Sequence, residues 1–410
     1  MRGRKALAKT KVHIGLSGNA TDRPAVMDAV AETLDALAVA QMIRPGSKVV
    51  IKPNLTADTK LWQEGIVTNP YTVEGVVRYV QKARPSEVVI AEATACGLDN
   101  KKAFRENGLE EVASRTGARI VDLYDEEFIP MPVKNGMVTK EISVARRVLE
   151  VDFLINVPTM KTHVATGVSL SLKNLKGVLP EREKRRSHFL GVNEFVTDLN
   201  TIVRPHLCLI DGTVAMEGDG PMQGTPVHLG LLVAGTDPVA TDIVATRVMG
   251  LDPRAFKWFD FARRRRIGVW READIAVGGA PIDKVKRAFR PATGPFPSIP
   301  GITLIDGGAC PGCLDGVRIA LSRIEKAGLL GRLPRLTVVA GKGGNVTGDD
   351  CMVVGRCLAR CRDMRRYVPG CPPQVFVIAD ELREMAGLER LFGPKSQYLL
   401  DEVKEGDDEE

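Results

Sequence analysis

Thiol groups are concentrated near the end of the chain. Six of the eight cysteines lie between residues 310 and 371, and the preceding residues contain only Cys96 and Cys208. Cys310-Pro-Gly-Cys313 is a CxxC motif, which brings two sulfur atoms to one point. Further cysteines on neighbouring loops can complete a four-thiolate site for zinc or for an iron–sulfur cluster. The other cysteines of this segment are Cys351, Cys357, Cys361 and Cys371.

Three interpretations of the CxxC pair compete. Buried thiols can pack as small apolar groups with no further role. A thioredoxin-like dithiol also lies between a strand and the start of a helix. The third interpretation, half of a metal site, is favoured because a dithiol enzyme has no need of the cysteines that follow.

Basic residues form a second group of candidate functional residues. The motif Asn156-Val-Pro-Thr-Met-Lys161-Thr-His163 begins at the end of an expected strand, and Lys52 and Asn54 follow another strand in the same way. Ligands of α/β sheets bind at the carboxyl ends of strands. Cations that meet there would form a pocket for phosphate or carboxylate, although charge runs more often coat exposed helices. The remaining candidate members are Lys173, Asn174, Lys176 and Arg182.

Histidine and acidic side chains complement this predicted anion pocket. His163 and His188 are the candidates for proton transfer, because imidazole titrates near neutral pH, and Lys161 is grouped with them as catalytic. Asp211 and Glu217 follow the expected strand 207–210 in a Gly-rich loop, where they could bind a divalent ion or orient the lysines. Alternatively, Asp211 could cap a turn, and Asp237, which precedes Pro238, could cap a helix, whereas Glu217 has no such position.

Composition narrows the class of protein. The chain has 410 residues, 44% hydrophobic and 26% charged, which is typical of a globular protein of two or three domains. A net charge of +6 and only 5% aromatic residues argue against nucleic acid as the partner. No apolar run is long enough for a membrane span, and no apolar segment follows the basic N-terminus. We therefore predict a cytoplasmic protein, in which clustered thiols serve metal or redox chemistry.

The elements that must position these residues alternate between strand and helix. This pattern predicts an α/β domain over residues 1–290, with a mostly parallel sheet between covering helices. Strands are expected at 12–15, 48–51, 87–91, 119–121, 153–157, 207–210 and 229–234. Helices are expected at 24–40, 70–84, 101–116, 237–249 and 253–265. A hairpin with an Asn-Gly turn is expected to join 128–133 to 137–142.

A Pro/Gly-rich linker is predicted at 291–301, followed by a smaller α/β domain at 302–400 and an acidic tail at 401–410. The smaller domain is expected to contain strands at 302–305, 336–340 and 374–378 and helices at 314–327 and 381–391. The cysteines would lie in its strand-to-helix loops.

Two family resemblances rest on these motifs. Tyr367-Val-Pro-Gly-Cys371-Pro-Pro373 resembles the last cluster-binding segment in the small subunits of nickel–iron hydrogenases and in the related subunit of NADH–quinone oxidoreductase. That resemblance implies a flavodoxin-like domain holding one [4Fe-4S] cluster, with Cys310, Cys313, Cys357 and Cys371 as ligands. Cys357 lies closer to Cys371 than the corresponding pair does in those families, so Cys351 and Cys361 remain alternatives to it. A flavin is a second candidate cofactor, because flavodoxin-like loops bind one without a short motif.

The other resemblance covers roughly residues 45–250 and is with the family of domains of unknown function numbered 362. The motifs that carry it are Lys52-Pro-Asn54, Asn156-Val-Pro158, Lys161-Thr-His163, Lys173-Asn174, Lys176-Gly177, Asp211-Gly212, Glu217-Gly-Asp-Gly-Pro221 and Asp237-Pro-Val-Ala-Thr-Asp242. Many members of that family are fused to iron–sulfur modules.

These observations favour an iron–sulfur oxidoreductase that moves electrons between a cluster and a small anionic substrate. A non-catalytic electron carrier that serves a partner protein is the first alternative. The second is a cluster-free anion-binding enzyme with structural zinc.

Overall fold

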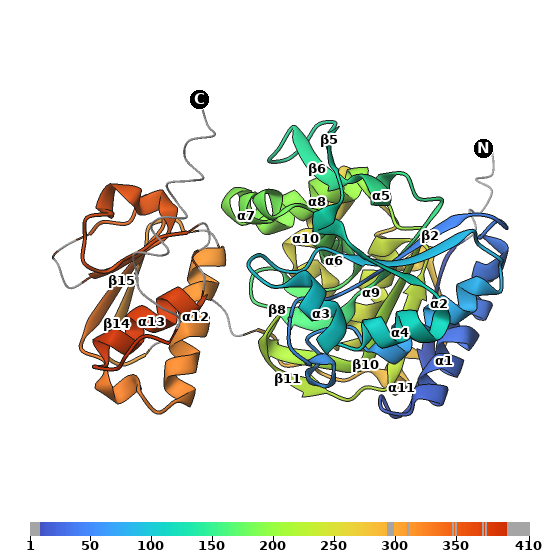
Figure 1. Ribbon diagram of the computed structural model, residues 1–410, viewed down its shortest axis with the longest axis horizontal. Coiled ribbons are helices and arrows are strands. Elements are labelled where there is room, and N and C mark those ends of the chain that lie inside the picture. Colours follow the sequence, from blue (N-terminus) through green and yellow to red (C-terminus); the bar gives the residue numbers. More distant parts are fainter. Residues whose placement is uncertain are drawn as a thin grey trace. The chain divides into compact units, whose positions relative to one another are not determined.

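The computed structural model describes residues 9–292, 299–309, 311–346, 348, 351–370, 373 and 375–391. The chain divides into two compact units, each with its own sheet (Figure 1). The first comprises residues 1–184 and 193–292, and the second comprises 185–192 and 293–410. The predicted acidic tail and residues 293–298 of the predicted linker lie outside the described residues.

The sheet of the first unit has eleven strands, whose main path runs β13-β1-β12-β10-β7-β2-β3-β4. From β10 to β4 all neighbours on this path are parallel, as the sequence predicts for an α/β sheet. β2, β3 and β7 are buried along nearly their whole length, which is why they are continuous apolar runs. The strands are β1 (Thr10–Leu16), β2 (Lys48–Pro53), β3 (Glu87–Glu92), β4 (Arg119–Asp122), β7 (Phe153–Val157), β8 (Thr159–His163), β9 (Gly167–Ser169), β10 (Leu207–Asp219), β11 (Gln223–Val227), β12 (Leu231–Gly235) and β13 (Ile275–Gly279).

Helices connect these strands and begin at recognisable signals. Asp22, Asn69 and Asp237 each cap a helix with a side-chain oxygen, and each of these helices has proline in its first turn. The predicted helix 101–116 is divided at Gly108, whose φ of 75° interrupts the helical backbone. The helices are α1 (Arg23–Ala36), α2 (Pro70–Gln81), α3 (Asn100–Glu106), α4 (Leu109–Thr116), α5 (Arg146–Leu149), α6 (Ser171–Asn174), α7 (Glu181–Leu190), α8 (Val192–Ile202), α9 (Pro238–Val248), α10 (Lys257–Arg265) and α11 (Ile282–Val285).

The first unit differs from the sequence-based expectation in three places. The predicted hairpin is confirmed, since β5 (Phe128–Pro132) pairs with β6 (Glu141–Ala145). Its second strand begins later than predicted, because the backbone N–H groups of Met137 and Val138 donate to the Asp198 carboxylate instead of a strand. The predicted Gly-rich loop after residue 210 is a continuation of β10, which is long enough to pair with both β12 and β11. Residues 159–163, for which the sequence predicted no element, form strand β8, which pairs with β9 and β10.

The second unit contains a four-stranded parallel sheet in the order β14 (Ile302–Asp306), β15 (Leu336–Ala340), β16 (Cys351–Val354) and β17 (Tyr367–Val368). Two helices, α12 (Pro311–Lys326) and α13 (Val375–Met385), share a core with one face of this sheet. The predicted strand 374–378 is wrong, because residues 375–378 form the first turn of α13. Val377, Ile378 and Leu382 are buried in that core at helical spacing.

Candidate functional site

The carboxyl ends of three parallel strands meet at one edge of the first sheet. Lys52 of β2 is in register with Asn156 of β7, and β3 ends at Glu92. α6 and the 3₁₀ turn η4 (Leu175–Val178) lie against this edge. The Asn156 amide donates to the Ser171 carbonyl at 2.8 Å, and the Ala93 N–H donates to the Gly177 carbonyl at 2.9 Å. The residues predicted to meet at the strand ends are therefore brought to one place.

A buried ion pair lies at the centre of this edge. Lys52 Nζ is 2.7 Å from Glu92 Oε2 and 2.9 Å from the Pro53 carbonyl oxygen, and both side chains are at most 3% exposed. Burial raises the pKa of Glu92 to about 7 even though the lysine charge acts against this change. Burial lowers the pKa of Lys52, whereas the negative charge of Glu92 and its hydrogen bond raise this pKa. A Cβ on Gly177 would lie 1.7 Å from Glu92 Oε1, so this close approach of η4 requires glycine.

Further lysines surround the ion pair. Lys161 is 1% exposed on β8, and its Nζ donates to the Ile66 carbonyl at 2.6 Å. Burial holds the pKa of Lys161 well below its usual value, and the charge of Lys173 adds to this effect. The pKa of Lys176 is lowered for the same two reasons.

Lys184 of α7 completes the group from a third direction. Its Nζ donates to the carbonyls of Ala93 and Thr94 and to the Tyr124 hydroxyl, at 2.7–2.8 Å. Burial lowers the pKa of Lys184 to about 8. We call Lys52, Lys161, Lys173, Lys176 and Lys184 the lysine cluster.

The lysine cluster places several mutually repelling ammonium groups at one strand edge. Lys173 lowers the pKa values of both Lys161 and Lys176, and Glu92 opposes the lowered pKa values of Lys52, Lys161 and Lys184. An anion bound among these groups would favour their charged forms and would therefore bind together with protons. This arrangement can neutralise and orient a small anion.

Amide and carboxylate groups fix the backbone around the cluster. Asn174 donates to the Asn156 side chain at 2.8 Å and to the Pro53 carbonyl at 3.2 Å, and Asn54 donates to the Ile66 carbonyl at 3.1 Å. The carboxylate of Asp242 accepts from the N–H groups of the first two residues of α6, at 2.8 and 3.0 Å. Burial raises the pKa of Asp242 to about 7. These contacts hold α6, which carries Lys173, on the strand ends.

Two predicted acidic members have other partners. Asp211 is 1% exposed and accepts from the N–H of Asn69 at 2.7 Å and from both the N–H and the hydroxyl of Thr213. Glu217 accepts from the Arg290 N–H at 3.0 Å and lies 3.6 Å from the Arg287 guanidinium. Within the described part of the chain, neither carboxylate bonds to a cluster lysine. The bonds of Asp211 support the capping alternative for that residue, whereas Glu217 contacts Arg287 and Arg290.

The two predicted histidines and Arg182 lie on β8 and α7. His163 is 5% exposed on β8, and its Nδ1 accepts from the Ala165 N–H at 2.9 Å, which leaves Nε2 as the protonated nitrogen of the neutral ring. His188 and Arg182 lie on α7, where Arg182 is exposed. Lys184 is the residue of α7 that reaches the cluster, and the sequence analysis missed it. It also missed Glu92, although the strand-end rule applied to the strand at 87–91 would have found it.

Two predicted cluster ligands converge in the second unit. Cys313 lies in the first turn of α12, and Cys357 lies in the 3₁₀ segment η8 (Arg356–Cys361). A Cβ on Gly355, whose φ is 104°, would lie 2.9 Å from Cys313 Sγ and 3.6 Å from Cys357 Sγ. The two sulfur atoms thus border one space that exists because residue 355 has no side chain. Cys310 and Cys371 lie outside the described residues. Among the residues that the structure does describe, no three side chains of the metal-binding types lie together.

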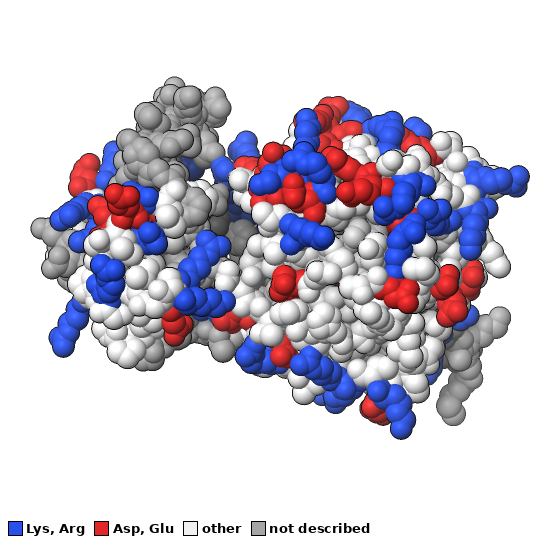
Figure 2. Space-filling view, turned by 60° about the horizontal axis from the view of Figure 1, so that its bottom comes forward, with Lys and Arg blue, Asp and Glu red and all other residues white. Residues whose placement is uncertain are grey.

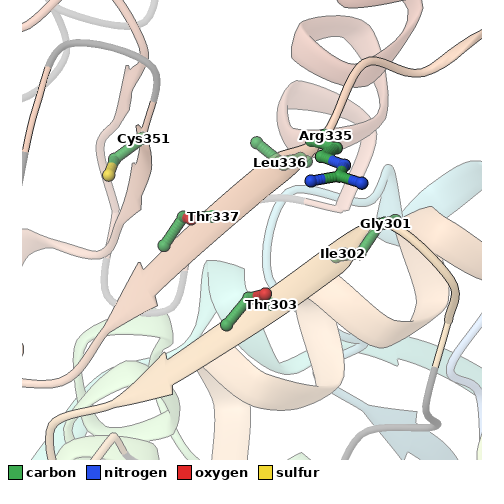
Figure 3. Close-up of a pocket in the computed structure, with 7 residues that line it drawn as sticks. All are labelled: Gly301, Ile302, Thr303, Arg335, Leu336, Thr337 and Cys351. Carbon is green, nitrogen blue, oxygen red and sulfur yellow. The ribbon is translucent and has the colours of Figure 1, made fainter.

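Cys351 lies at the other end of its strand. Four residues of β-strand place it about 13 Å from Gly355, too far to share a centre with Cys313 and Cys357. Instead, Cys351 borders a pocket of about 430 Å³ at the amino ends of β14, β15 and β16, where it is in register with Thr337, which pairs with Thr303 (Figure 3). Cys361 packs at the end of η8 against a small core that includes Cys351 and Tyr367.

Charged side chains of both signs are interspersed over the upper part of the larger unit in the view of Figure 2, and a broad area below them carries few charges.

Among the helices of the described residues, none combines the length and apolar sequence of a membrane span.

Comparison with known proteins finds partial similarity to one named protein and to two solved structures. The chain is 27% identical over 233 residues to a protein of Synechocystis sp. named as thylakoid-associated, a match that spans 55% of this chain and 70% of that protein. It also resembles a Thermotoga maritima structure at 14% identity and a TM-score of 0.32, covering 52% of this chain and 55% of that one. The lactate racemase apoprotein of Thermoanaerobacterium thermosaccharolyticum matches at 13% identity and a TM-score of 0.36, covering 58% and 57%.

The chain therefore spans just over half the length of either solved structure, and similarity at these scores supports no statement about function. The family comparison is more specific, because the matched segment contains the entire lysine cluster. Residues 49–247 match the family described as "Domain of unknown function (DUF362)", which confirms this resemblance for that part of the chain.

Proposed function

We propose that the protein binds a small anion at the lysine cluster and is an oxidoreductase whose electrons pass through an iron–sulfur cluster in the second unit. The observation that carries the anion site is the burial of Lys52, Lys161 and Lys184 near the Glu92 carboxylate. Buried lysines are costly unless a negative charge compensates them, and a bound anion supplies that charge.

The residues proposed to hold the iron–sulfur cluster are Cys313 and Cys357, with Cys310 and Cys371 as the predicted remaining ligands. The space beside Gly355 that the first two sulfur atoms border supports this assignment. A [4Fe-4S] cluster supplies and accepts single electrons when it is bound.

Lysine side chains would neutralise the anion, and Glu92 and His163 would carry protons. Lys161, Lys173 and Lys176 would neutralise the anion, because the charge of Lys173 lowers the pKa values of Lys161 and Lys176 when the anion is absent. Glu92, with a pKa of about 7, can hold or release a proton near neutral pH. His163 is the second proposed proton carrier. The proposed location is the cytoplasm, a reducing compartment in which clustered thiols would stay available for metal or redox chemistry.

Anaerobic metal analysis tests the second unit. The purified protein should be brown, with broad absorption near roughly 400 nm that dithionite bleaches. Cys313→Ser and Cys357→Ser should each lose iron. Cys208→Ser is the matched control, since Cys208 is buried in β10 of the first unit. A colourless protein with stoichiometric zinc would favour the cluster-free enzyme and overturn the redox proposal.

Calorimetry with inorganic phosphate and with oxalate tests the anion site. Lys161→Met should abolish binding of whichever probe binds, whereas Lys284→Met, at an exposed position of α11, should not. Repeating the titration in buffers of different ionisation enthalpy should reveal proton uptake on binding. Binding that Lys161→Met leaves intact refutes the site. Turnover of a small molecule without a partner distinguishes the oxidoreductase from a carrier.

A further inference from the structure

Five arginines lie within eleven residues beside the second unit's thiols. Residues 356–366, here called the arginine segment, contain one acidic residue, Asp363. Apolar side chains recur every third residue in the segment, at Leu358, Cys361 and Met364, and pack on a core with Tyr367. The positions between them face outward. The arginines of the segment are Arg356, Arg360, Arg362, Arg365 and Arg366, of which all but Arg366 are exposed.

Hydrogen bonds fix the arginine segment to the carboxyl edge of the second sheet. The Arg356 N–H donates to the Gly370 carbonyl at 2.9 Å. The Arg360 guanidinium donates to the carbonyls of Lys342 and Gly344, at 3.1 and 2.9 Å, and so ties the segment to the loop after β15. The exposed side chain of Lys342 extends the positive surface. Cys357 belongs to the same segment, so this surface adjoins the thiols that converge at Gly355.

We propose that the arginine segment is the docking surface for a small acidic electron-transfer protein. This inference rests on the proposed function, because the partner would exchange electrons with the cluster held at Cys313 and Cys357. One electron would pass from the reduced iron centre of the partner to an oxidised cluster held by these cysteines, and no bond would form or break. A positive surface around a redox centre raises the rate of encounter with a negative partner and orients it.

The composition of the segment favours a protein over a nucleic acid. Single strands bind by stacking bases on exposed aromatic rings as well as by charge. The aromatic residue that follows the segment, Tyr367, is 1% exposed and belongs to the core. The outward face of the segment therefore offers charge and hydrogen-bond donors without a stacking platform.

The test measures binding of an acidic plant-type ferredoxin to the full chain by calorimetry, at about 20 mM and about 300 mM salt, where screening differs strongly. Arg362→Glu combined with Arg365→Glu should weaken binding at low salt by about tenfold or more. Lys284→Glu combined with Lys286→Glu imposes the same change in net charge at exposed positions of the first unit and should alter binding by less than about twofold. High salt should weaken wild-type binding and remove the difference between the variants.

Several outcomes would overturn the docking surface. These are equal weakening in both double variants, salt-independent binding, no binding of ferredoxin, equally tight binding of basic cytochrome c, or displacement of ferredoxin by a single-stranded oligonucleotide. Iron content is measured first in every variant. A wild-type protein without iron refutes the proposed function, whereas an iron-loaded protein that fails the binding test refutes only the docking surface. If the glutamate variant does not fold, Arg362→Gln with Arg365→Gln replaces it, with the same expected direction.

Discussion

Replacing Lys52 by methionine should reveal the energetic role of the buried ion pair. The substitution keeps the length of the side chain and removes the ammonium that lies 2.7 Å from Glu92. Both side chains are almost fully buried, so the carboxylate would remain without its ion partner. Removing one partner of such a pair costs about 3–5 kcal/mol, and we expect a loss of that size in the free energy of unfolding at pH 8.5.

The loss should depend on pH with a definite sign. The folded-state pKa of Glu92 is about 7, above the unfolded value of 4.5. Between these values the folded protein retains a proton that the unfolded chain has released. The contribution of Glu92 to stability is thus fully present below pH 4.5 and falls as the pH rises towards 7. The slope is about 1.4 kcal/mol per pH unit. Without Lys52 the pKa of Glu92 rises further, so the decline continues to higher pH in the variant.

Urea unfolding followed by tryptophan fluorescence measures this effect in the first unit alone, because all three tryptophans lie there. The difference between wild type and Lys52→Met should be small at pH 5 and largest at pH 8.5. Glu92→Gln and the double variant complete a cycle, and the double variant should lose less than the summed single losses by about 1–3 kcal/mol. A difference that does not change with pH, or additive losses, would refute the assignment of a coupled buried pair.

Three further substitutions test separate features. Glu74→Gln should cost about 2 kcal/mol in urea unfolding at neutral pH, because the buried Glu74 carboxylate accepts from three arginines. Burial alone would raise the pKa of Glu74, but these arginines lower it to about 2, so the stabilisation present above pH 4.5 should vanish as pH falls through 2. Asp242→Asn should weaken calorimetric phosphate binding about tenfold, because an amide offers one acceptor where α6 needs two. Gly355→Ala should lower the iron content, since the new Cβ would enter the space between the thiols, whereas Gly331→Ala, with no atom near its Cβ, should not.

Much of the first unit follows from local sequence signals. Asp237 followed by proline predicts a helix start because the side chain satisfies an orphan N–H group, and the structure confirms it. Continuous apolar runs such as β2 predict buried parallel strands. Parallel strands end at the same edge of a sheet, and ligands bind there. This rule also predicts that Lys52 and the Lys173–Lys176 region meet. Cys313 and Cys357 could be grouped from a motif resemblance, before any geometry was known.

Other features depend on partners that are distant in sequence. Residues 159–163 form strand β8 because β9 and β10 provide its hydrogen-bond partners, a condition that no local pattern expresses. The apolar start of α13 has the composition of a strand, and only its packing with α12 makes it helical. Burial likewise distinguishes Lys184 from its exposed neighbour Arg182. The sequence by itself predicted that Lys52, Lys161, Lys173 and Lys176 gather at one strand edge, and it missed Glu92 and Lys184. Only the tertiary structure decided which lysines are desolvated, because desolvation is set by everything that packs around a side chain.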